Sequence, residues 1–198
     1  VERIAAELNV WISVDTSKPI VMRESVAAGA HLINDVRALS VPGALEAAAA
    51  AQVPVCLMHM QGEPATMQVK PHYEELVGEI HHFFEQRIMA CNEAGILRER
   101  LILDPGFGFG KTMVQNYQLL GRLSELTQFE LPLLVGMSRK SMIGQLLGRP
   151  VNERLVGSVA AALYAVTQGA QIIRVHDVQE TVDALRVFSY PQHVIRMR

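Results

Sequence analysis

The sequence predicts an α/β fold of the (β/α)8 barrel type, and three observations lead to this prediction. Short apolar segments alternate with helical segments six times along the 198 residues, which indicates a parallel sheet. These segments are continuously apolar, as expected for strands that are buried on both faces. Nearly every one of them ends in a polar residue, and a ring of polar strand ends is typical of the mouth of a barrel. The competing architecture, a doubly wound open sheet, gathers its site between two neighbouring strands.

The first half of the chain alternates helices and strands three times. Helices are expected at residues 1–8, 19–28 and 43–52, and strands at residues 10–14, 32–33 and 53–58. Residues 15–17 (Asp-Thr-Ser) close the first strand and supply N-cap candidates for the following helix. Gly29 is placed to end that helix, and the alanine-rich third helix has high intrinsic propensity. A polar loop then runs from Met60 to about Pro71.

The second half continues the alternation. Helices are expected at residues 72–94, 115–128, 152–168 and 178–187, and one more is expected to begin at Ser141. Strands are expected at residues 101–103, 131–137 and 171–175. Apolar residues recur at three- and four-residue spacing through residues 72–94, which indicates an amphipathic helix. A faint repeat relates residues 26–34 to residues 166–174 and aligns Asn34 with Arg174 at the ends of their strands.

Residues 101–111 contain the most informative stretch, Leu-Ile-Leu-Asp-Pro-Gly-Phe-Gly-Phe-Gly-Lys. Asp104 stands where the buried strand ends, and a loop with three glycines at alternate positions follows it. The loop is not a P-loop, because that motif needs a glycine where this chain has Pro105, and it does not fit a dinucleotide fingerprint. An acid at a strand end over a glycine loop favours a functional site.

The polar strand ends fall into two chemical groups. Asp15, Asn34 and Asp104 offer carboxylates and an amide, which suit a planar heterocycle rich in N–H donors. The cationic group consists of Lys140, Arg174 and His176, which suit phosphate or diphosphate. Because residues two apart on a strand face the same side, we expect Ser138 and Lys140 to point together, and likewise Arg174 and His176.

Several of these residues also have simple structural interpretations. Asp15 fits a helix cap about as well as a site residue, and Asn34 and Asp104 fit turns. His59 is more simply a histidine with satisfied hydrogen bonds than a metal ligand. The pair His81-His82 is expected on the surface of the long helix, and Lys111 is expected to be a solvated loop charge.

Composition narrows the possible classes of partner and compartment. The net charge of −2 and the pI near 6.4 give no reason to expect nucleic acid. No run approaches 18 apolar residues, so no membrane span is expected. Cys56 and Cys91 lack the spacing of metal ligands and are expected to be buried thiols. No signal peptide is visible, so we expect a cytoplasmic protein. Residues 1–198 are expected to form a single domain.

Taken together, six segments resemble the bacterial dihydropteroate synthase family of pterin-binding barrels, which sulfonamides target. They occur in the order of that family and are spread over the whole chain. The segments are residues 14–19 (VDTSKP), 33–35 (IND), 57–62 (LMHMQG), 104–111 (DPGFGFGK), 136–141 (GMSRKS) and 174–177 (RVHD).

The resemblance implies a (β/α)8 barrel that joins 6-hydroxymethyl-7,8-dihydropterin diphosphate to p-aminobenzoate in folate synthesis. The residues implied to contact the pterin are Asp15, Asn34, Met58, Asp104 and Lys140. Phe109 and Lys140 would flank the p-aminobenzoate ring, whose carboxylate would meet Ser141. Arg174 and His176 would bind the diphosphate, and Lys140, Arg174 and His176 would act in catalysis.

The resemblance also implies Mg²⁺ as a cofactor and a homodimer as the assembly. The first strands of the family and two mobile loops, one with a Mg²⁺-contacting Asn, would lie before Val1. We therefore expect no metal ligand in this chain, a barrel without its first two strands, and little or no synthase activity from the 198 residues alone.

Two alternative functions stay open at this point. A barrel that moves a methyl group from methyltetrahydrofolate to a corrinoid protein would share the pterin-holding Asp and Asn residues. It has no diphosphate to bind, so the cationic residues Lys140 and Arg174 discriminate against it. The second alternative is a truncated pterin-binding module without catalysis.

Overall fold

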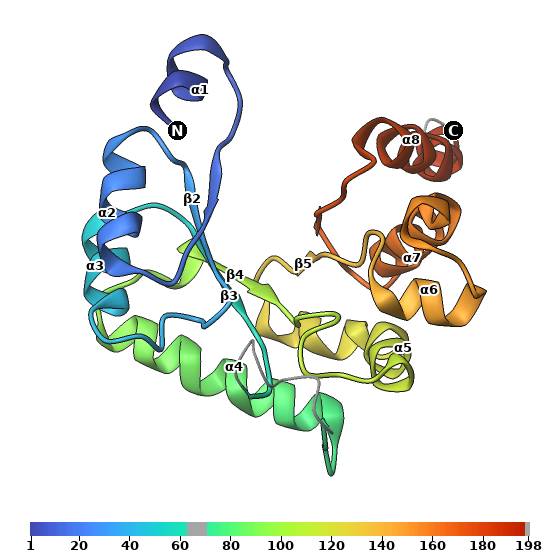
Figure 1. Ribbon diagram of the computed structural model, residues 1–198, viewed down its shortest axis with the longest axis horizontal. Helices are drawn as coiled ribbons and strands as arrows, with labels where there is room; N and C mark the ends of the chain where they lie inside the picture. Colours follow the sequence, from blue (N-terminus) through green and yellow to red (C-terminus); the bar gives the residue numbers. More distant parts are fainter. Residues whose placement is uncertain (63–70, 197–198) are drawn as a thin grey trace.

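The computed structural model describes residues 1–62 and 71–196 and confirms the alternation of parallel strands and helices (Figure 1). The elements in chain order are α1 (Glu2–Glu7), β1 (Ser13–Asp15), α2 (Pro19–Ala27), β2 (Leu32–Asp35), α3 (Ala44–Ala51), β3 (Val55–Met58), α4 (Leu76–Glu93), β4 (Leu101–Asp104), α5 (Met113–Gly121), β5 (Leu134–Val135), α6 (Ser141–Leu147), α7 (Leu155–Thr167), β6 (Ile172–Ile173) and α8 (Val178–Arg196). The loop predicted from Met60 to Pro71 lies largely outside the described residues.

The strands pair in consecutive order, as in the wall of a barrel. One parallel sheet has the order β1-β2-β3-β4, and a second pairs β5 with β6. Among the described residues, one isolated bridge between Leu103 and Leu133 connects the two sheets, supported by a hydrogen bond of 2.9 Å from the Leu103 N–H to the Pro132 carbonyl. A doubly wound sheet would reverse its strand order at the centre. The consecutive order therefore supports an incomplete (β/α)8 barrel.

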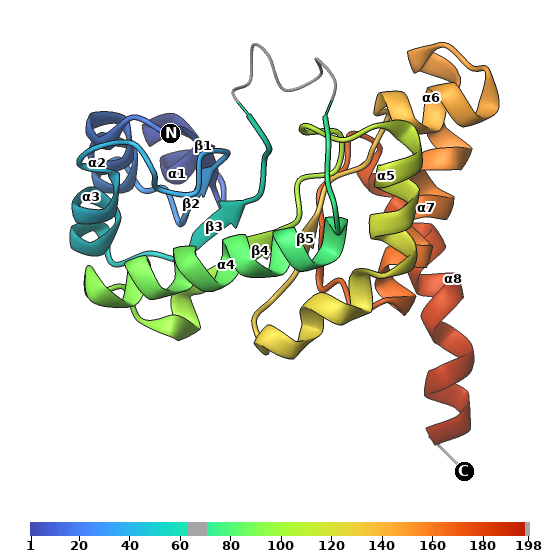
Figure 2. The ribbon, with the colours of Figure 1, turned by 90° about the horizontal axis from the view of Figure 1, so that it is seen from below.

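The helices cover the outer face of the strands. Helices α2, α3 and α4 lie along the four-stranded sheet, and α5 to α8 lie beside β5 and β6 (Figures 1 and 2). The core forms between these layers, where Ile33, Leu57 and Leu103 of the strands are fully buried. The buried face of α4 includes Ile80 and Phe84, as its apolar spacing predicts. This packing leaves the carboxyl ends of the strands at one common edge.

The strands are shorter than predicted. Strand β1 begins at Ser13, because its register with β2 starts at the pair Ser13 and Leu32. The prediction of a strand at residues 10–14 is thus wrong at its start, and the Trp11 side chain is 78% exposed. Strands β5 and β6 have only two residues each, since the chain turns away after Val135 and after Ile173.

Two helices also differ from the prediction. The helix expected at residues 115–128 ends at Gly121 and continues as the 3₁₀ helix Leu123–Phe129. Three residues per turn place Leu123, Leu126 and Phe129 on one buried face, which α-helical spacing would not do. Helix α8 extends to Arg196, beyond the predicted end at residue 187. It contains Pro191, which lacks a backbone N–H donor but does not end the helix.

Two expectations about the bulk of the chain can also be compared with the structure. Cys56 and Cys91 are both free and buried, as predicted. Within residues 1–62 and 71–196, none of the helices combines the length and the apolar character that crossing a membrane requires.

Candidate functional site at the strand ends

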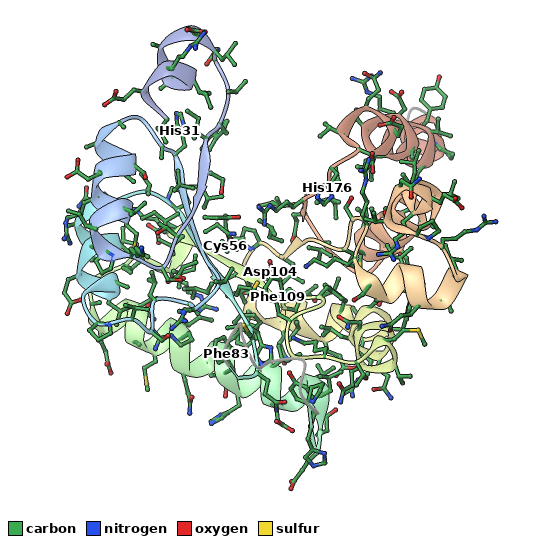
Figure 3. All side chains as sticks on the ribbon, in the orientation of Figure 1. His31, Cys56, Phe83, Asp104, Phe109 and His176 are labelled. Carbon is green, nitrogen blue, oxygen red and sulfur yellow. The ribbon has the colours of Figure 1, made fainter. Side chains whose placement is uncertain are left out.

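A cleft of about 270 Å³ opens at the carboxyl ends of the strands, and we call it the strand-end cleft. Its lining residues come from β2, β3 and β4 and from the turns around β5 and β6: Asn34, Val36, Met58, Asp104, Phe109, Gly136, Ser138, Lys140, Arg174, Val175 and His176. Figure 3 shows Asp104 and Phe109 near the middle of the molecule and His176 on the segment that leads into α8. The structure thus brings most of the predicted site residues into one cavity.

The registers of the four-stranded sheet explain one side of this cleft. Asp15 pairs with Asn34 across β1 and β2, and Met58 pairs with Asp104 across β3 and β4. The Asn34 Nδ2 donates to Asp15 Oδ1 at 2.5 Å, and the second carboxylate oxygen of Asp15 accepts from Arg174 Nη2 at 2.5 Å. Asp15 is itself exposed and lies at the rim, where it orients Asn34 and Arg174.

Asn34 has a buried acceptor without a partner. Among the described residues, none donates a hydrogen bond to its Oδ1, although the residue is only 4% exposed. A buried carbonyl that lacks a donor costs roughly 1–3 kcal/mol. An N–H donor of a ligand in the strand-end cleft would satisfy this oxygen, as the sequence interpretation of Asn34 requires.

Asp104 is a buried carboxylate on the floor of the cleft. It is 8% exposed, and its Oδ1 accepts the Gly106 N–H at 2.8 Å. Burial raises the pKa of Asp104, while the Gly106 hydrogen bond and the nearby Lys140 oppose that shift. The side chain is therefore a turn residue and a cleft residue at once, so both sequence interpretations hold for it.

The glycine loop after β4 passes close to the end of β3. Gly106 has φ of +71°, and a Cβ atom there would lie 1.8 Å from the His59 carbonyl oxygen. The backbone N–H of Gly108 donates to Asn116 Oδ1 at 2.7 Å, and Asn116 Nδ2 donates to the Thr112 carbonyl at 2.7 Å. Only glycine permits this approach, which fixes the loop that carries Phe109 into the cleft.

Lys111 corrects the sequence interpretation. It was expected to be a solvated loop charge, yet it is 3% exposed. Its Nζ donates to the carbonyls of Gly106 at 3.0 Å and Phe109 at 3.1 Å, and lies 3.0 Å from His59 Nδ1. Burial lowers the pKa of Lys111 to about 7. The glycine loop was the signal in the sequence that could have indicated a buried Lys111. A tightly folded glycine loop turns backbone carbonyls inward, and these carbonyls need a hydrogen-bond donor.

The histidines largely match their expectations. His59 was predicted to be a histidine with satisfied hydrogen bonds, and it is buried with its Nδ1 hydrogen-bonded to Lys111; burial together with that neighbouring charge lowers its pKa. His82 lies on the surface of α4. His81 is only partly exposed, because its ring stacks on Phe129 at a centroid distance of 4.3 Å, so the surface prediction is wrong for this residue.

Lys140 lies between the glycine loop and the cleft. Its Nζ donates to the Phe107 carbonyl at 2.5 Å and lies 4.6 Å from the centroid of the Phe109 ring. Burial lowers the pKa of Lys140 to about 8, Asp104 opposes that shift, and Arg174 adds to it. The predicted neighbours Lys140 and Phe109 therefore do lie together, on a wall next to Asp104.

Ser138 orients His176. Its Oγ accepts the His176 backbone N–H at 3.2 Å and lies 3.0 Å from His176 Nδ1. These two contacts fix the orientation of the His176 ring at the lining of the cleft.

The cationic residues reach the cleft by a route that the sequence did not indicate. Strand alternation was expected to align Ser138 with Lys140, but β5 ends at Val135 and the following residues form a turn with Arg139 at φ of +58°. Ser141, the first residue of α6, is exposed and does not line the cleft. Of the predicted site residues, only Asp15 and Ser141 lie outside the lining.

The described residues offer no ready cage for a metal ion. Within residues 1–62 and 71–196, no group of three or more His, Cys, Asp or Glu side chains could hold one. A magnesium ion needs only one or two carboxylates when phosphate oxygens supply other ligands. Lys140 and Arg174, which line the strand-end cleft, are side chains that suit an anion.

Comparisons with known proteins agree with this geometry. Residues 1–176 match the model of a family described as pterin binding enzyme. The chain is 63% identical over 187 residues to the dihydropteroate synthase of Escherichia coli K12, and the match covers 94% of this chain and 66% of that protein. It is 53% identical over 188 residues to the Haemophilus influenzae dihydropteroate synthase, with 95% of this chain and 68% of that protein covered. The chain thus spans slightly less than two thirds of the length of its Escherichia coli relative.

Solved structures show the same fold. A Yersinia pestis dihydropteroate synthase in a sulfonamide drug complex superposes with a TM-score of 0.95 and 59% identity, over 98% of this chain and 70% of that one. The dihydropteroate synthase from Xanthomonas albilineans in complex with 7,8-dihydropteroate gives a TM-score of 0.90 and 52% identity, over 96% of this chain and 72% of that one.

Proposed function

Because the chain belongs to the pterin-binding enzyme family, we propose that it forms the pterin and diphosphate site of a dihydropteroate synthase. Such an enzyme condenses 6-hydroxymethyl-7,8-dihydropterin diphosphate with p-aminobenzoate to give 7,8-dihydropteroate and diphosphate. One observation carries the proposal: the lining of the strand-end cleft combines the acceptors Asn34 and Asp104, which we call the acceptor side, with Lys140, Arg174 and His176, which we call the cationic side.

The acceptor side suits a pterin ring. The unpartnered Oδ1 of Asn34 and the carboxylate of Asp104 would accept hydrogen bonds from ring N–H groups. Asp15 would hold Asn34 in place through its hydrogen bond to Nδ2. Met58 supplies an apolar surface beside Asp104, which suits the face of a planar ring.

The cationic side suits the diphosphate. Arg174 would bind it with its guanidinium fork, and His176 would donate from its imidazole ring. As the C–O bond at the pterin methylene breaks, both electrons go to the leaving diphosphate oxygen. Cations aimed at that developing charge lower the barrier. The positive charge on the methylene carbon is delocalised into the ring, so a dissociative displacement is favoured.

The amine of p-aminobenzoate then forms the new C–N bond and loses one proton. Its ring would lie against Phe109 and Lys140, whose Nζ lies 4.6 Å from the centroid of the Phe109 ring. Ser141 follows Lys140 directly and would meet the carboxylate of p-aminobenzoate at the rim of the cleft. No covalent intermediate on the protein is needed, so neither buried cysteine takes part.

Mg²⁺ would enter with the diphosphate as a complex, where its charge would further stabilise the leaving group. The described residues offer no cluster of ligands for it, so this chain would contact the ion mainly through the diphosphate. The roles proposed here for Lys140, Arg174 and His176 are therefore roles toward the organic substrates.

A homodimer is proposed as the assembly. A groove of about 430 Å³ on the outer face of α5, α6 and α7 is lined almost wholly by apolar groups, including Tyr117, Leu147 and Tyr164. The exposed apolar side chains of Leu146, Leu147 and Tyr164 at this groove favour a protein partner over solvent. The buried free thiols of Cys56 and Cys91 support a reducing compartment, and we place the reaction in the cytoplasm.

Calorimetric titration of the chain tests the function. We expect the diphosphate ester of 6-hydroxymethyl-7,8-dihydropterin to bind at least about tenfold more tightly than the alcohol, because charge-assisted hydrogen bonds are worth about 1.5–3 kcal/mol each. Methyltetrahydrofolate serves as the comparison ligand. If it bound more tightly than the diphosphate ester, a methyltransferase-like barrel would replace this proposal.

A further inference from the structure

We propose that the ion pair between Arg139 and Asp177 is a positioning pair, which sets Lys140 and His176 at a fixed separation on the cationic side of the strand-end cleft. Arg139 directly precedes Lys140, and Asp177 directly follows His176. Neither member of the pair lines the cleft. The inference rests on the proposed function for its substrate and extends it to residues outside the cleft.

The pair has a geometry that fixes direction as well as distance. Arg139 Nε donates to Asp177 Oδ2 at 2.9 Å, and Arg139 Nη2 donates to Asp177 Oδ1, so the contact is bidentate. The two residues are 38 apart in sequence, and the carboxylate side chain is only 12% exposed. A bidentate arginine–carboxylate contact constrains the planes of both groups. It therefore joins the turn after β5 to the turn after β6.

The backbone of Arg139 is held from a third element. Its φ of +58° lies in the left-handed region, which is unfavourable for a side chain as large as arginine. The N–H of Arg139 donates to Ser158 Oγ at 2.9 Å, and its carbonyl accepts from Arg154 Nη1 at 2.9 Å. Ser158 Oγ in turn donates to the Arg154 carbonyl at 2.7 Å. Helix α7 thus maintains a strained turn whose side chain reaches Asp177.

A second contact joins the same two turns. Ser138 Oγ bonds both to the backbone N–H and to Nδ1 of His176. Two consecutive residues on one turn, 138 and 139, therefore contact two consecutive residues on the other, 176 and 177. Two such contacts restrict rotation of the turns as well as their separation. Lys140 and His176, which belong to these two turns, are then held in one arrangement toward diphosphate. Residues outside a site commonly position the groups that touch a ligand in this way.

Stability alone gives a weak reason for this pair. Exposed ion pairs contribute about 0–1 kcal/mol, and the Arg139 side chain is 39% exposed. The strained backbone conformation also costs about 1–3 kcal/mol. An arrangement that costs strain for little net stability, next to two cleft cations, points to a role in geometry.

The test uses variants that separate the ion pair from the backbone. Arg139→Gly removes the guanidinium and tolerates the left-handed φ, whereas Asp177→Asn removes the charge of the partner. Glu130→Gly is the matched control for Arg139→Gly, because Glu130 is exposed and also has positive φ, at +53°. Glu153→Gln is the matched control for Asp177→Asn, because it belongs to an exposed pair with Arg149.

Inorganic diphosphate and the pterin alcohol are the two probes, titrated calorimetrically into each variant. We expect Arg139→Gly and Asp177→Asn each to weaken diphosphate binding by about tenfold or more, since small displacements of positioned groups cost up to about 10²-fold. The pterin alcohol, held from the four-stranded sheet, should change by less than about threefold. The double variant should lose no more than either single variant, because the pair acts as a unit. Diphosphate affinity equal to that of the controls would overturn the proposal.

A ligand-free measurement keeps the inference separate from the proposed function. The ¹⁵N resonances of the His176 ring report its contact with Ser138, and we expect both pair variants to shift them while Glu130→Gly and Glu153→Gln do not. If the unaltered chain bound no diphosphate, the proposed function would fail, and the His176 resonances would still decide the inference. Unshifted resonances in both pair variants would contradict it.

Discussion

Asp104 combines burial, a hydrogen bond to its own loop and a place on the floor of the cleft. We expect Asp104→Ala to weaken binding of 6-hydroxymethyl-7,8-dihydropterin by roughly 10- to 100-fold, because hydrogen bonds to a charged group are worth about 1.5–3 kcal/mol. Calorimetry on the chain measures this, with Asp183→Ala as control, since that side chain is 56% exposed on α8. An unchanged affinity in Asp104→Ala would remove Asp104 from the site.

Arg174 is predicted to act on a different part of the substrate. Arg174→Ala should weaken binding of the diphosphate ester by about tenfold or more and that of the pterin alcohol much less, because the guanidinium faces the anion. Arg186→Ala is the control, with a side chain that is 78% exposed and remote from the cleft. Equal losses for ester and alcohol would mean that Arg174 acts only by orienting Asp15, to which it donates at 2.5 Å.

Lys111 makes stability depend on pH. Its pKa is about 7 in the folded chain and 10.5 ordinarily, because burial disfavours the charged form. Between these values the unfolded chain binds more protons, so stability rises with pH across this window, by up to about 1.4 kcal/mol per pH unit. Lys111→Met lacks this titration, so its stability relative to the unaltered chain should fall from pH 7 to pH 10. Chemical denaturation at several pH values measures it, and parallel curves would contradict it.

At the scale of single elements, the glycine loop is the most sensitive segment. A Cβ at Gly106 would lie 1.8 Å from a backbone carbonyl, whereas one at Gly95 would meet nothing within 4 Å, although both residues have positive φ. Each substitution by alanine incurs the conformational strain of about 1–3 kcal/mol, but only Gly106→Ala adds the clash. We therefore expect Gly106→Ala to lower the free energy of unfolding well beyond Gly95→Ala in urea denaturation. Equal losses would show that the loop can shift away from β3.

The elements also show what local sequence patterns can and cannot predict. The alternation, the buried face of α4 and the helix-ending Gly29 follow from local periodicity and conformation, and all are confirmed. The start of β1 was wrong because pairing with Leu32 decides it, and no local pattern records that register. Lys111 was misplaced for the same reason, since its partners His59 and Gly106 are brought to it by the fold.

The candidate site divides in the same way. The strand ends Asn34 and Asp104 were predictable, because parallel strands deliver their carboxyl ends to one edge. The geometry that brings Lys140 into the cleft could not be predicted, because it depends on a left-handed turn at Arg139 that is held by α7. Sequence reasoning therefore identified the residues of the cleft more reliably than the manner in which they are held.

For the whole molecule, the apolar groove on α5, α6 and α7 predicts association. Leu147→Asp places a charge in this groove, and we expect it to convert a dimer to a monomer in analytical ultracentrifugation, because an unpaired charge is costly at an apolar interface. Leu97→Asp is the control, with an equally exposed leucine, 50% against 48%, outside the groove. Pterin affinity should be unchanged in both. An unaltered sedimentation coefficient for Leu147→Asp would place the interface elsewhere.

The sparse junction between the two sheets has a consequence for the energetics of the whole chain. Asn34 and Asp104 belong to one sheet and His176 follows the other, and within residues 1–62 and 71–196 the strands of the two sheets are joined by one backbone bridge, from Leu103 to Leu133. A ligand that contacts both sides completes the junction, so thermodynamic linkage applies: at a hundredfold excess over its Kd it adds about 2.7 kcal/mol to the folded state. That is a large share of the 5–15 kcal/mol that hold a typical domain together. A ligand bound in the strand-end cleft would therefore contribute to the free energy that keeps this chain folded.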